Sequence, residues 1–392
     1  MAALDIHMDG VPGPLGRIEE VGGALQFRYT GAALDQGRVL SLSMPLRDEP
    51  YGDVATRAFF DALLPDGPQY QALLQRQGAS PDDLLSLLRL LGQDGPGALR
   101  CVPPGLPPVN LGDLSRDYDL LSARDLEAMP GRLGVVELSG GWGVARSGAA
   151  APCTHVLTLP DEPAMSRQQA LMEIAAVALP HPVAETRIVE LADRRALLTR
   201  RVDRKVAAGR VHRLHVESFA QALGPERPFT AAQVGLMLAK TRVPIAARAR
   251  FRDITLLHLV VGNRDNHAGS HLLLHDGPGK PVLAPLTGIE PVLHHPLTGP
   301  PLAFEIGGAK RMAELSLDAL VAFHREIGFR INPDSKRQIA ALRAAASDLF
   351  RAVSEAVSRL KGEPFEMMGD RITHHLRLLN AGLGLNVPMP HV

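Results

Sequence analysis

The chain has 392 residues and is 45% hydrophobic, enough to bury one large core or two moderate ones, which excludes an intrinsically disordered chain. Its 42 Lys and Arg residues balance 42 Asp and Glu residues, so no overall field favours nucleic acid, an anionic membrane or acidic substrates. Two cysteines, Cys101 and Cys153, cannot form a disulfide framework or a four-ligand zinc site, and we expect both to be inert thiols.

The N-terminal residues predict a small sheet and no export signal. Residues 1–46 contain two β-like runs separated by Gly and Pro turns, GALQFRYT and RVLSLSMPL. No Lys or Arg precedes Arg17, which is the opposite of a secretory signal, and no apolar run is long enough to cross a bilayer. We therefore expect a cytoplasmic protein.

Two helices are expected after this sheet. In GDVATRAFFDALLPDG, hydrophobic residues recur at helical spacing until Pro65. In SPDDLLSLLRLLG, Ser80 is expected to cap the helix, Pro81 to occupy its first position and Gly92 to end it. The Pro- and Gly-rich run PPGLPPVNLGD then predicts an extended linker.

The next elements follow the order of a kinase N-lobe. A glycine-rich segment, LSGGWGVARSG, precedes the probable strand THVLTLP, an alanine-rich helix starting near Ser166 and the strand pair RIVEL and ALLTRRV. From residue 216 helices dominate, interrupted by the hairpin HLLLHDGPGKPVLAP. The last residues, NVPMPHV, are expected to be poorly ordered.

Several blocks, in order, resemble the HipA family of toxin-antitoxin proteins. They are LSLSMPL, FFDALLPDG, LGQDGPGAL, THVLTLP, RRVDR, HVESFAQALG, VVGNRDNHAGS, VLAP and LAFEIGG. The resemblance implies an α+β, protein-kinase-related bilobal fold with a small N-terminal β/α subdomain, a mixed N-lobe and an all-helical C-lobe. The expected limits are 1–104 for the subdomain, 105–134 for a linker, 135–215 for the rest of the N-lobe, 216–385 for the C-lobe and 386–392 for the tail.

Family members with intact motifs are serine/threonine kinases that use ATP and Mg²⁺, act as growth-arresting toxins and are held in check by a small helix-turn-helix antitoxin. The resemblance therefore implies ATP and Mg²⁺ as cofactors and an antitoxin as partner. No direct contact with nucleic acid or a membrane is expected, because the net charge is zero and no apolar run is long enough to cross a bilayer. The resemblance names no protein substrate.

Only some of the family's catalytic and metal-binding residues are present in this chain. Asp265 in GNRDNHAGS matches the catalytic aspartate, and the metal-binding Asn five residues later is replaced by Ser270. The second metal ligand, an aspartate after the hairpin, falls on Gly288. Glu290 is the nearby carboxylate, either a substitute ligand or a surface residue before Pro291. Asp265 is therefore the candidate catalytic residue, and Ser270 and Glu290 are the candidate metal ligands.

The phosphate-holding lysine expected on THVLTLP is replaced by Thr158, which leaves Glu173 in the next helix as either an unpaired or an ordinary surface glutamate. The glycine-rich segment offers Ser139, Gly140 and Gly141 for backbone contacts to phosphate, and Arg146 is its nearest cation. A solvated loop is the alternative.

HVESF resembles the segment that links the lobes and meets adenine through its backbone. Glu217 and Phe219 match the family's pattern, whereas Ser218 replaces an acidic residue. We expect adenine binding to survive better than phosphate binding.

Two other patterns receive structural interpretations. His267, His271 and His275 recur at every fourth residue, which on a helix would resemble a metal-binding face. His271 and His275 lie in a strand-like run, however, and no cysteine or carboxylate completes a zinc site. The arginines of TRRVDRKVAAGR are expected in a solvated hairpin and not on a nucleic-acid surface.

The sequence therefore favours a degenerate protein that keeps the scaffold and has lost efficient phosphotransfer through Thr158, Ser270 and Gly288. One alternative is an active kinase toxin that uses Glu290, Ser270 and Arg146 around Asp265. Another is a protein-binding module that ignores nucleotide.

Overall fold

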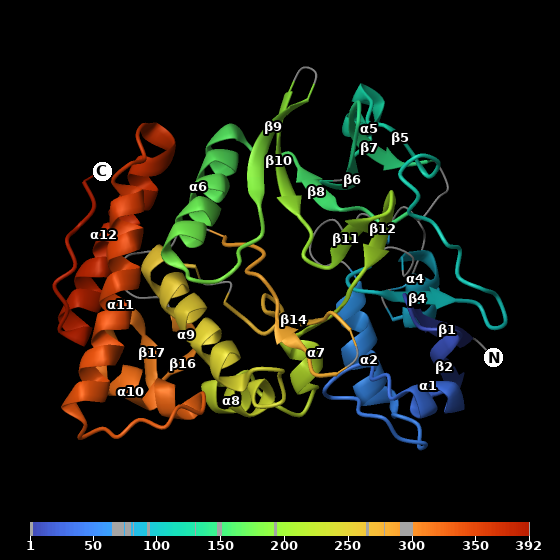
Figure 1. The fold of residues 1–392 in the computed structure, drawn as a ribbon, viewed down its shortest axis with the longest axis horizontal. Helices are drawn as coiled ribbons and strands as arrows, with labels where there is room; N and C mark the ends of the chain where they lie inside the picture. The colour runs from blue at the N-terminus through green and yellow to red at the C-terminus, as the bar shows by residue number, and fades with distance from the viewer. Residues whose placement is uncertain are drawn as a thin grey trace. The chain divides into compact units, whose positions relative to one another are not determined.

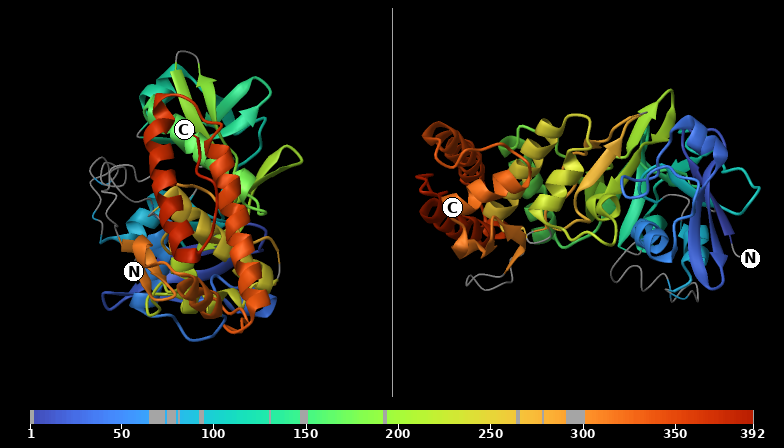
Figure 2. Two further views of the ribbon diagram at one scale, coloured as in Figure 1. Left: turned by 90° about the vertical axis from the view of Figure 1, so that its left-hand side faces the viewer. Right: turned by 90° about the horizontal axis from the view of Figure 1, so that it is seen from below.

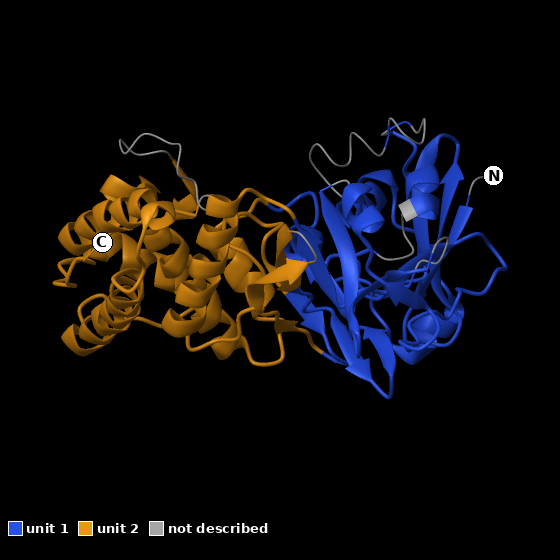
Figure 3. Ribbon diagram, turned by 90° about the horizontal axis from the view of Figure 1, so that it is seen from above, with its two compact units in different colours: residues 1–158, 200–227, 273–279 blue, residues 159–199, 228–272, 280–392 orange. Residues whose placement is uncertain are grey.

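The described chain forms two compact units, coloured separately in Figure 3. Unit 1 comprises Met1–Thr158, Arg200–Arg227 and Leu273–Gly279, and unit 2 comprises Leu159–Thr199, Pro228–Leu272 and Lys280–Val392. The computed structural model describes residues 3–64, 74, 80, 82–91, 95–129, 131–146, 151–191, 194–263, 266–277, 279–290 and 301–391. Unit 1 carries most of the strands and unit 2 most of the long helices, so the expected α+β class is confirmed.

Unit 1 begins with a four-stranded antiparallel sheet in the order β3-β2-β1-β4 (Figure 1). Alternate residues of β3 are buried, and Ile6 of β1, Ile18 of β2 and Phe27 of β3 are 0% exposed. The predicted strand GALQFRYT is β3. The bounds are β1 Ala3–Met8, β2 Pro14–Val21, β3 Ala24–Tyr29 and β4 Leu99–Val102.

The second predicted strand, RVLSLSMPL, does not form. Its backbone bonds to side chains and not to a neighbouring strand. The Leu40 amide donates to the Tyr29 hydroxyl at 2.8 Å, and that hydroxyl donates to the carbonyl of Met44 at 2.5 Å. The Leu42 amide donates to the Glu217 carboxylate at 3.2 Å. Polar side chains from elsewhere in unit 1 therefore take the place of a sheet ladder.

Helices pack beside this sheet, and α2 contacts β3 while α4 contacts β1. The helix expected to start after Ser80 begins later, because the Asp83 carboxylate accepts from the Ser86 amide at 3.1 Å and the Asp83 carbonyl accepts from the Leu87 amide at 3.1 Å. The expected role of Pro81 and Gly92 lies outside the described residues. The bounds are α1 Gly31–Gln36, α2 Asp53–Phe60, η1 Asp61–Leu63 and α4 Leu84–Leu91.

The rest of unit 1 contains a second group of strands, ordered β5-β7-β6-β8, a hairpin of β11 and β12, and β13 beside β14. The predicted strands THVLTLP and HLLLH are β8 and β14. The bounds are β5 Tyr118–Leu120, α5 Ala123–Glu127, β6 Arg132–Leu138, β7 Gly141–Ala145, β8 His155–Thr158, β11 Arg204–Ala207, β12 Arg210–Arg213, β13 His215–Ser218, α7 Phe219–Leu223 and β14 Leu272–His275.

The hairpin of β11 and β12 was expected to be solvated, but part of its charge is buried. The side chain of Arg204 is 0% exposed, and its Nη1 lies 2.7 Å from Oδ2 of Asp203. Asp203 also accepts from Nη2 of Arg201 at 2.9 Å and from the Gly97 amide at 2.7 Å. The RRVDR motif therefore joins this hairpin to the segment before β4, a long-range role that its charge alone did not reveal.

Unit 2 is mainly helical. Its alanine-rich helix, expected near Ser166, begins earlier because Oδ1 of Asp161 accepts from the Ala164 amide at 2.7 Å and caps it. The predicted strand pair is present as antiparallel β9 and β10. The bounds are α6 Glu162–Ala178, β9 Thr186–Leu191, β10 Arg194–Arg200, α8 Ala231–Leu238, α9 Pro244–Val261, β15 Val282–Leu283, β16 Pro301–Ile306, β17 Ala309–Arg311, η2 Met312–Glu314, α10 Leu317–Glu326, α11 Lys336–Val357 and α12 Glu363–Leu383.

Helices α11 and α12 run side by side in the left-hand view of Figure 2, and both also contact α6 and α9. The tail after α12, expected to be poorly ordered, is anchored to these helices. Val387 is 2% exposed, and its carbonyl accepts from Nδ2 of Asn380 at 2.8 Å. The Ser354 hydroxyl donates to the Pro388 carbonyl at 2.6 Å. None of the helices in the described part of the chain has the length and apolar character needed to cross a membrane.

Candidate nucleotide and metal site

The glycine-rich segment of unit 1 is a β-hairpin whose tip contains the predicted phosphate-binding residues. Leu138 of β6 pairs with Gly141 of β7, so Ser139 and Gly140 form the turn between them. All three predicted residues, Ser139, Gly140 and Gly141, are exposed, and Gly141 has a φ of 134°. A turn with this backbone presents main-chain N–H groups to solvent, which is what a phosphate contact requires.

Gly143 has a different role. A side chain there would lie 2.5 Å from Cδ1 of Leu138, so the residue is a glycine because the two strands pack closely. Trp142 lies edge-on to the ring of His155, with ring centroids 5.1 Å apart.

The nearest cation, Arg146, is held at the surface by an acidic partner. Its Nε lies 3.1 Å from Oδ1 of Asp119, and the two side chains are 52% and 63% exposed. An exposed pair of this kind is worth at most about 1 kcal/mol, so a bound phosphate can compete for the guanidinium group.

Thr158 ends β8 at the position of the expected lysine, and it is half-buried. Its partner in the β6–β8 ladder is Arg132, an exposed residue that our sequence reasoning missed. Directly opposed residues project from the same face of a sheet. The ladder therefore places a cationic residue beside the position from which the lysine is missing, a register that the sequence alone does not reveal.

The predicted adenine-binding segment contains buried side chains. Glu217 is 0% exposed and accepts from the Ser41 hydroxyl, from the Leu42 amide at 3.2 Å and from Nε2 of His275 at 2.9 Å. Phe219 is also 0% exposed, at the start of α7. Ser218, in place of the family's acidic residue, caps α7 in a capping box with Gln221. Because these side chains are buried or already bonded, adenine binding by this segment would use its backbone. That role stays a prediction.

The catalytic loop follows α9 in unit 2, and Asp265 lies outside the described residues. Asn residues on both sides of it are anchored to buried histidines. Nδ2 of Asn263 lies 2.5 Å from Nδ1 of His258, and Oδ1 of Asn266 lies 2.6 Å from Nε2 of His271. Burial lowers the pKa of His258 and of His271 to about 3, so both rings are neutral hydrogen-bonding anchors at neutral pH.

Ser270 uses its hydroxyl within its own turn. The Oγ atom donates to the His267 carbonyl at 2.8 Å and accepts from the His267 amide at 3.1 Å. To ligate a metal ion, this oxygen would have to give up at least part of that turn.

The second predicted metal position is open. Gly288 is exposed, and among the described residues no atom lies within 4 Å of the position that a side-chain carbon would occupy. Ile289 is 3% exposed, whereas Glu290 is exposed. Across the described ranges no group of three or more His, Cys, Asp or Glu side chains could hold a metal ion.

The remaining predicted side chains are engaged elsewhere. Glu173 is exposed on α6 and accepts from Nε2 of Gln169 at 2.8 Å, which fits the surface-glutamate interpretation. His271 bonds to Asn266, and His275 bonds to Glu217.

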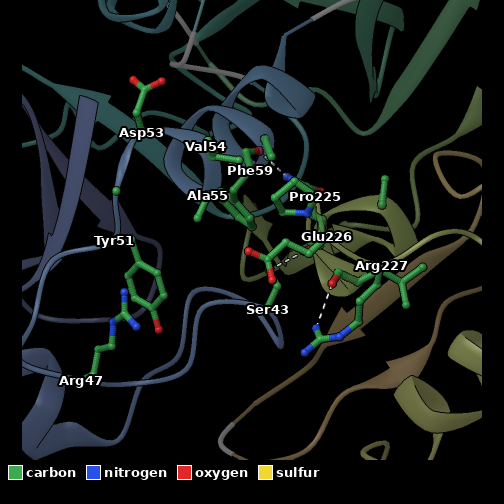
Figure 4. Close-up of a pocket in the computed structure, with 16 residues that line it drawn as sticks. Ser43, Arg47, Tyr51, Asp53, Val54, Ala55, Phe59, Pro225, Glu226 and Arg227 are labelled. Carbon is green, nitrogen blue, oxygen red and sulfur yellow. Dashed lines mark hydrogen bonds between the residues drawn. The ribbon is translucent and has the colours of Figure 1, made fainter. Parts of the chain in front are cut away.

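Unit 1 also has a surface groove of about 460 Å³, shown in Figure 4. Arg47 and Tyr51 lie on one side of the groove, where the guanidinium carbon is 3.7 Å from the ring centroid. Glu226 and Arg227 lie on the other side, and Asp53 also lines the groove. Its two basic and two acidic side chains favour neither an anion nor a cation.

Models of two protein domains match this chain. The HipA N-terminal domain matches residues 4–102, and the HipA-like C-terminal domain matches residues 142–359. The chain belongs to the HipA family.

Both curated relatives found are from Sinorhizobium fredii. The protein named "Putative kinase Y4mE" is 30% identical over 90% of this chain and 91% of its own length. "Putative kinase Y4dM" is 25% identical over 91% of this chain and 92% of its own length.

The HipA fold is also seen in a solved structure. A chain from the Shewanella oneidensis MR-1 complex of HipA, HipB and operator DNA matches with a TM-score of 0.79 at 20% identity, covering 97% of this chain and 98% of its own. The expected HipA-like, kinase-related fold is therefore confirmed.

Proposed function

We propose that this HipA-family protein is a pseudokinase of the toxin-antitoxin type, which keeps the kinase-related scaffold but has weak or absent phosphotransfer. The observation that carries the proposal is the open position at Gly288, where the family has a metal-binding aspartate and this chain has no side chain. Mg²⁺ prefers carboxylate ligands, so the loss of this group removes the strongest protein contribution to the metal site.

The geometry of the substitutes supports the same proposal. Ser270 contributes one neutral oxygen that already bonds to His267, and Arg146 is paired with Asp119. Each must exchange a present interaction for a new one before it can bind metal or phosphate. Removing one electrostatic stabiliser commonly lowers a rate by about two to three orders of magnitude, and here three positions differ.

One observation favours the alternative of an active, ATP- and Mg²⁺-dependent serine/threonine kinase. Arg132 lies opposite Thr158 in the ladder, on the face where the lysine would project. It is a candidate replacement for the phosphate-holding cation. If it binds phosphate, nucleotide binding can survive even where the metal site does not.

We also propose a small helix-turn-helix antitoxin as the partner. The support is the similar Shewanella protein, which is described in complex with HipB and its operator DNA. The test is co-purification of this chain with the product of a neighbouring helix-turn-helix gene. Direct DNA binding is not part of the proposal, since the net formal charge is zero.

The experiment that separates the two kinase interpretations is thermal unfolding without ligand, with ATP, and with ATP plus Mg²⁺. Ligand at about a hundred times its dissociation constant stabilises a protein by roughly 2.7 kcal/mol, a shift of a few degrees. A pseudokinase should show no additional shift on adding Mg²⁺. A Mg²⁺-dependent shift, together with phosphate incorporation that Asp265→Asn abolishes, would establish the active kinase instead.

A further inference from the structure

A second cavity of unit 1 shares no lining residue with the glycine-rich hairpin or the predicted adenine segment. It has a volume of about 570 Å³ and is lined by β1 and its following turn, by Arg100 of β4, by residues 107–111 and by β12. Small-molecule sites typically occupy about 300–1,000 Å³. The cavity is therefore large enough for a small ligand or a single side chain of a partner.

Positive charge dominates the lining. Three guanidinium groups, those of Arg100, Arg210 and Arg213, line the cavity together with one carboxylate, Asp9. Nη2 of Arg100 lies 2.5 Å from Oδ1 of Asp9, and Nε of Arg213 lies 4.0 Å from Oδ2 of the same residue. One carboxylate thus faces two arginines whose side chains are 8% and 1% exposed. The three guanidinium groups and the one carboxylate give the lining a net charge of plus two, the imidazoles not counted.

Nε of Arg100 and Nε2 of His7 are among the buried hydrogen-bonding atoms of the lining residues that have no partner in the described part of the chain. The other Arg100 nitrogens are fixed, because Nη1 donates to the Val109 carbonyl at 2.5 Å and Nη2 faces Asp9. The arginine is therefore held in one orientation with its Nε donor unsatisfied, an arrangement that costs free energy.

The rim of the cavity has a more adaptable arginine. The side chain of Arg210 is 30% exposed, with Nη1 3.7 Å from Asp113. Its Nη2 donates to the backbone and side-chain oxygens of Asn110 at 3.3 and 3.2 Å. Both hydrogen bonds are long and both acceptors are neutral. A negatively charged ligand oxygen can replace these acceptors, since charge-assisted hydrogen bonds are roughly twice as strong.

We propose that this cavity is an oxyanion site that takes a phosphate group, either as free phosphate or as a phosphate monoester on a phosphorylated side chain. A phosphate monoester carries about two negative charges at neutral pH, which matches the lining's excess of two. Guanidinium groups bind the oxygens of phosphate in a planar fork, so several arginines around one cavity fit this ligand. The site is independent of the nucleotide site and of the proposed loss of phosphotransfer.

The test is isothermal titration calorimetry with inorganic phosphate, in buffer whose ionic strength is matched with sodium chloride. The full chain should bind phosphate, and Arg210→Gln should weaken binding about tenfold, because the variant loses a charge-assisted hydrogen bond. Arg116→Gln is the matched control. Arg116 also pairs with Asp113, at 3.1 Å, but its side chain is 69% exposed and does not line the cavity.

Three results would overturn the proposal. They are no binding beyond that of chloride, equal weakening by Arg210→Gln and Arg116→Gln, and stronger weakening by Arg146→Gln, which would place phosphate at the glycine-rich hairpin. A titration with O-phosphoserine identifies the source of the phosphate. If O-phosphoserine binds more tightly than inorganic phosphate, the cavity is assigned to a phosphorylated protein segment. If it binds more weakly, the cavity is assigned to free phosphate.

Discussion

Nε2 of His275 lies 2.9 Å from Oε1 of Glu217, although 58 residues separate them in the chain. The same carboxylate accepts from Ser41 and Leu42, more than a hundred residues upstream. One buried side chain thus joins three distant segments of unit 1, namely the loop after α1, strand β13 and strand β14.

Replacing Glu217 should therefore destabilise unit 1. In Glu217→Gln one of the two acceptor oxygens becomes a donor, which leaves at least one of its present donors without an acceptor. A buried polar group that loses its partner costs about 1–3 kcal/mol, measurable as a lower urea midpoint. The control is Glu173→Gln on the exposed face of α6, expected within about 0.5 kcal/mol of wild type. Equal stability of the two variants would refute this structural role.

The stability of the protein should also depend on pH through Asp203. Burial alone would raise the pKa of this carboxyl, but the positive charges of Arg201 and Arg204 outweigh it and lower the pKa from 3.8 to about 2. A lowered pKa means that the carboxylate stabilises the folded state above pH 3.8 and loses this effect as pH falls towards 2. The contribution at neutral pH is about 2 kcal/mol.

Urea unfolding of wild type and Asp203→Asn at several pH values checks this expectation. The difference in free energy of unfolding should shrink between about pH 4 and pH 2, where the wild-type carboxylate becomes protonated. A difference that stays constant over this interval would mean that Asp203 is not charged in the folded protein.

The metal site should be recoverable. No atom of the described residues would obstruct a side chain at Gly288, so Gly288→Asp is expected to fold and, combined with Ser270→Asn, to give Mg²⁺-dependent stabilisation by ATP. The Gly288→Ala variant provides a side chain without a ligand and should show no such effect. If the double variant responds to Mg²⁺ no more than Gly288→Ala does, the missing aspartate is not what limits metal binding.

Both cysteines should resist thiol reagents in the native protein. Burial raises the pKa of Cys101 to about 12, and Cys101 and Cys153 are 1% and 6% exposed. Because the thiolate is the reactive form, modification is expected only after unfolding. Fast labelling of either residue by a coloured disulfide reagent in native buffer would contradict this.

Features determined by neighbouring residues could be predicted from the sequence, whereas features determined by distant partners could not. The strand at 24–29 and the helix around Phe59 and Phe60 follow from local periodicity. The irregular course of residues 38–46 depends on Tyr29 and Glu217, and the burial of Arg204 depends on Asp203 and the backbone near Gly97. Neither dependence leaves a local signature.

The same distinction applies to the candidate site. The hairpin tip at Ser139–Gly141 follows from a run of glycines. The position of Arg132 beside Thr158 could not be predicted from the sequence, because it depends on the register between β6 and β8. The capping residue of α4 is a third case, since Ser80 and Asp83 are both good N-caps and only the hydrogen bonds distinguish them.

The discontinuity of unit 1 has a consequence for its synthesis. Its three segments end at residues 158, 227 and 279, and Ser41 finds its acceptor on Glu217 only when that residue has left the ribosome. The N-terminal sheet can form early, but the loop after it must wait for more than half of the chain. During that interval Leu40 and Met44, which are 0% and 1% exposed in the folded chain, lack the partners that bury them.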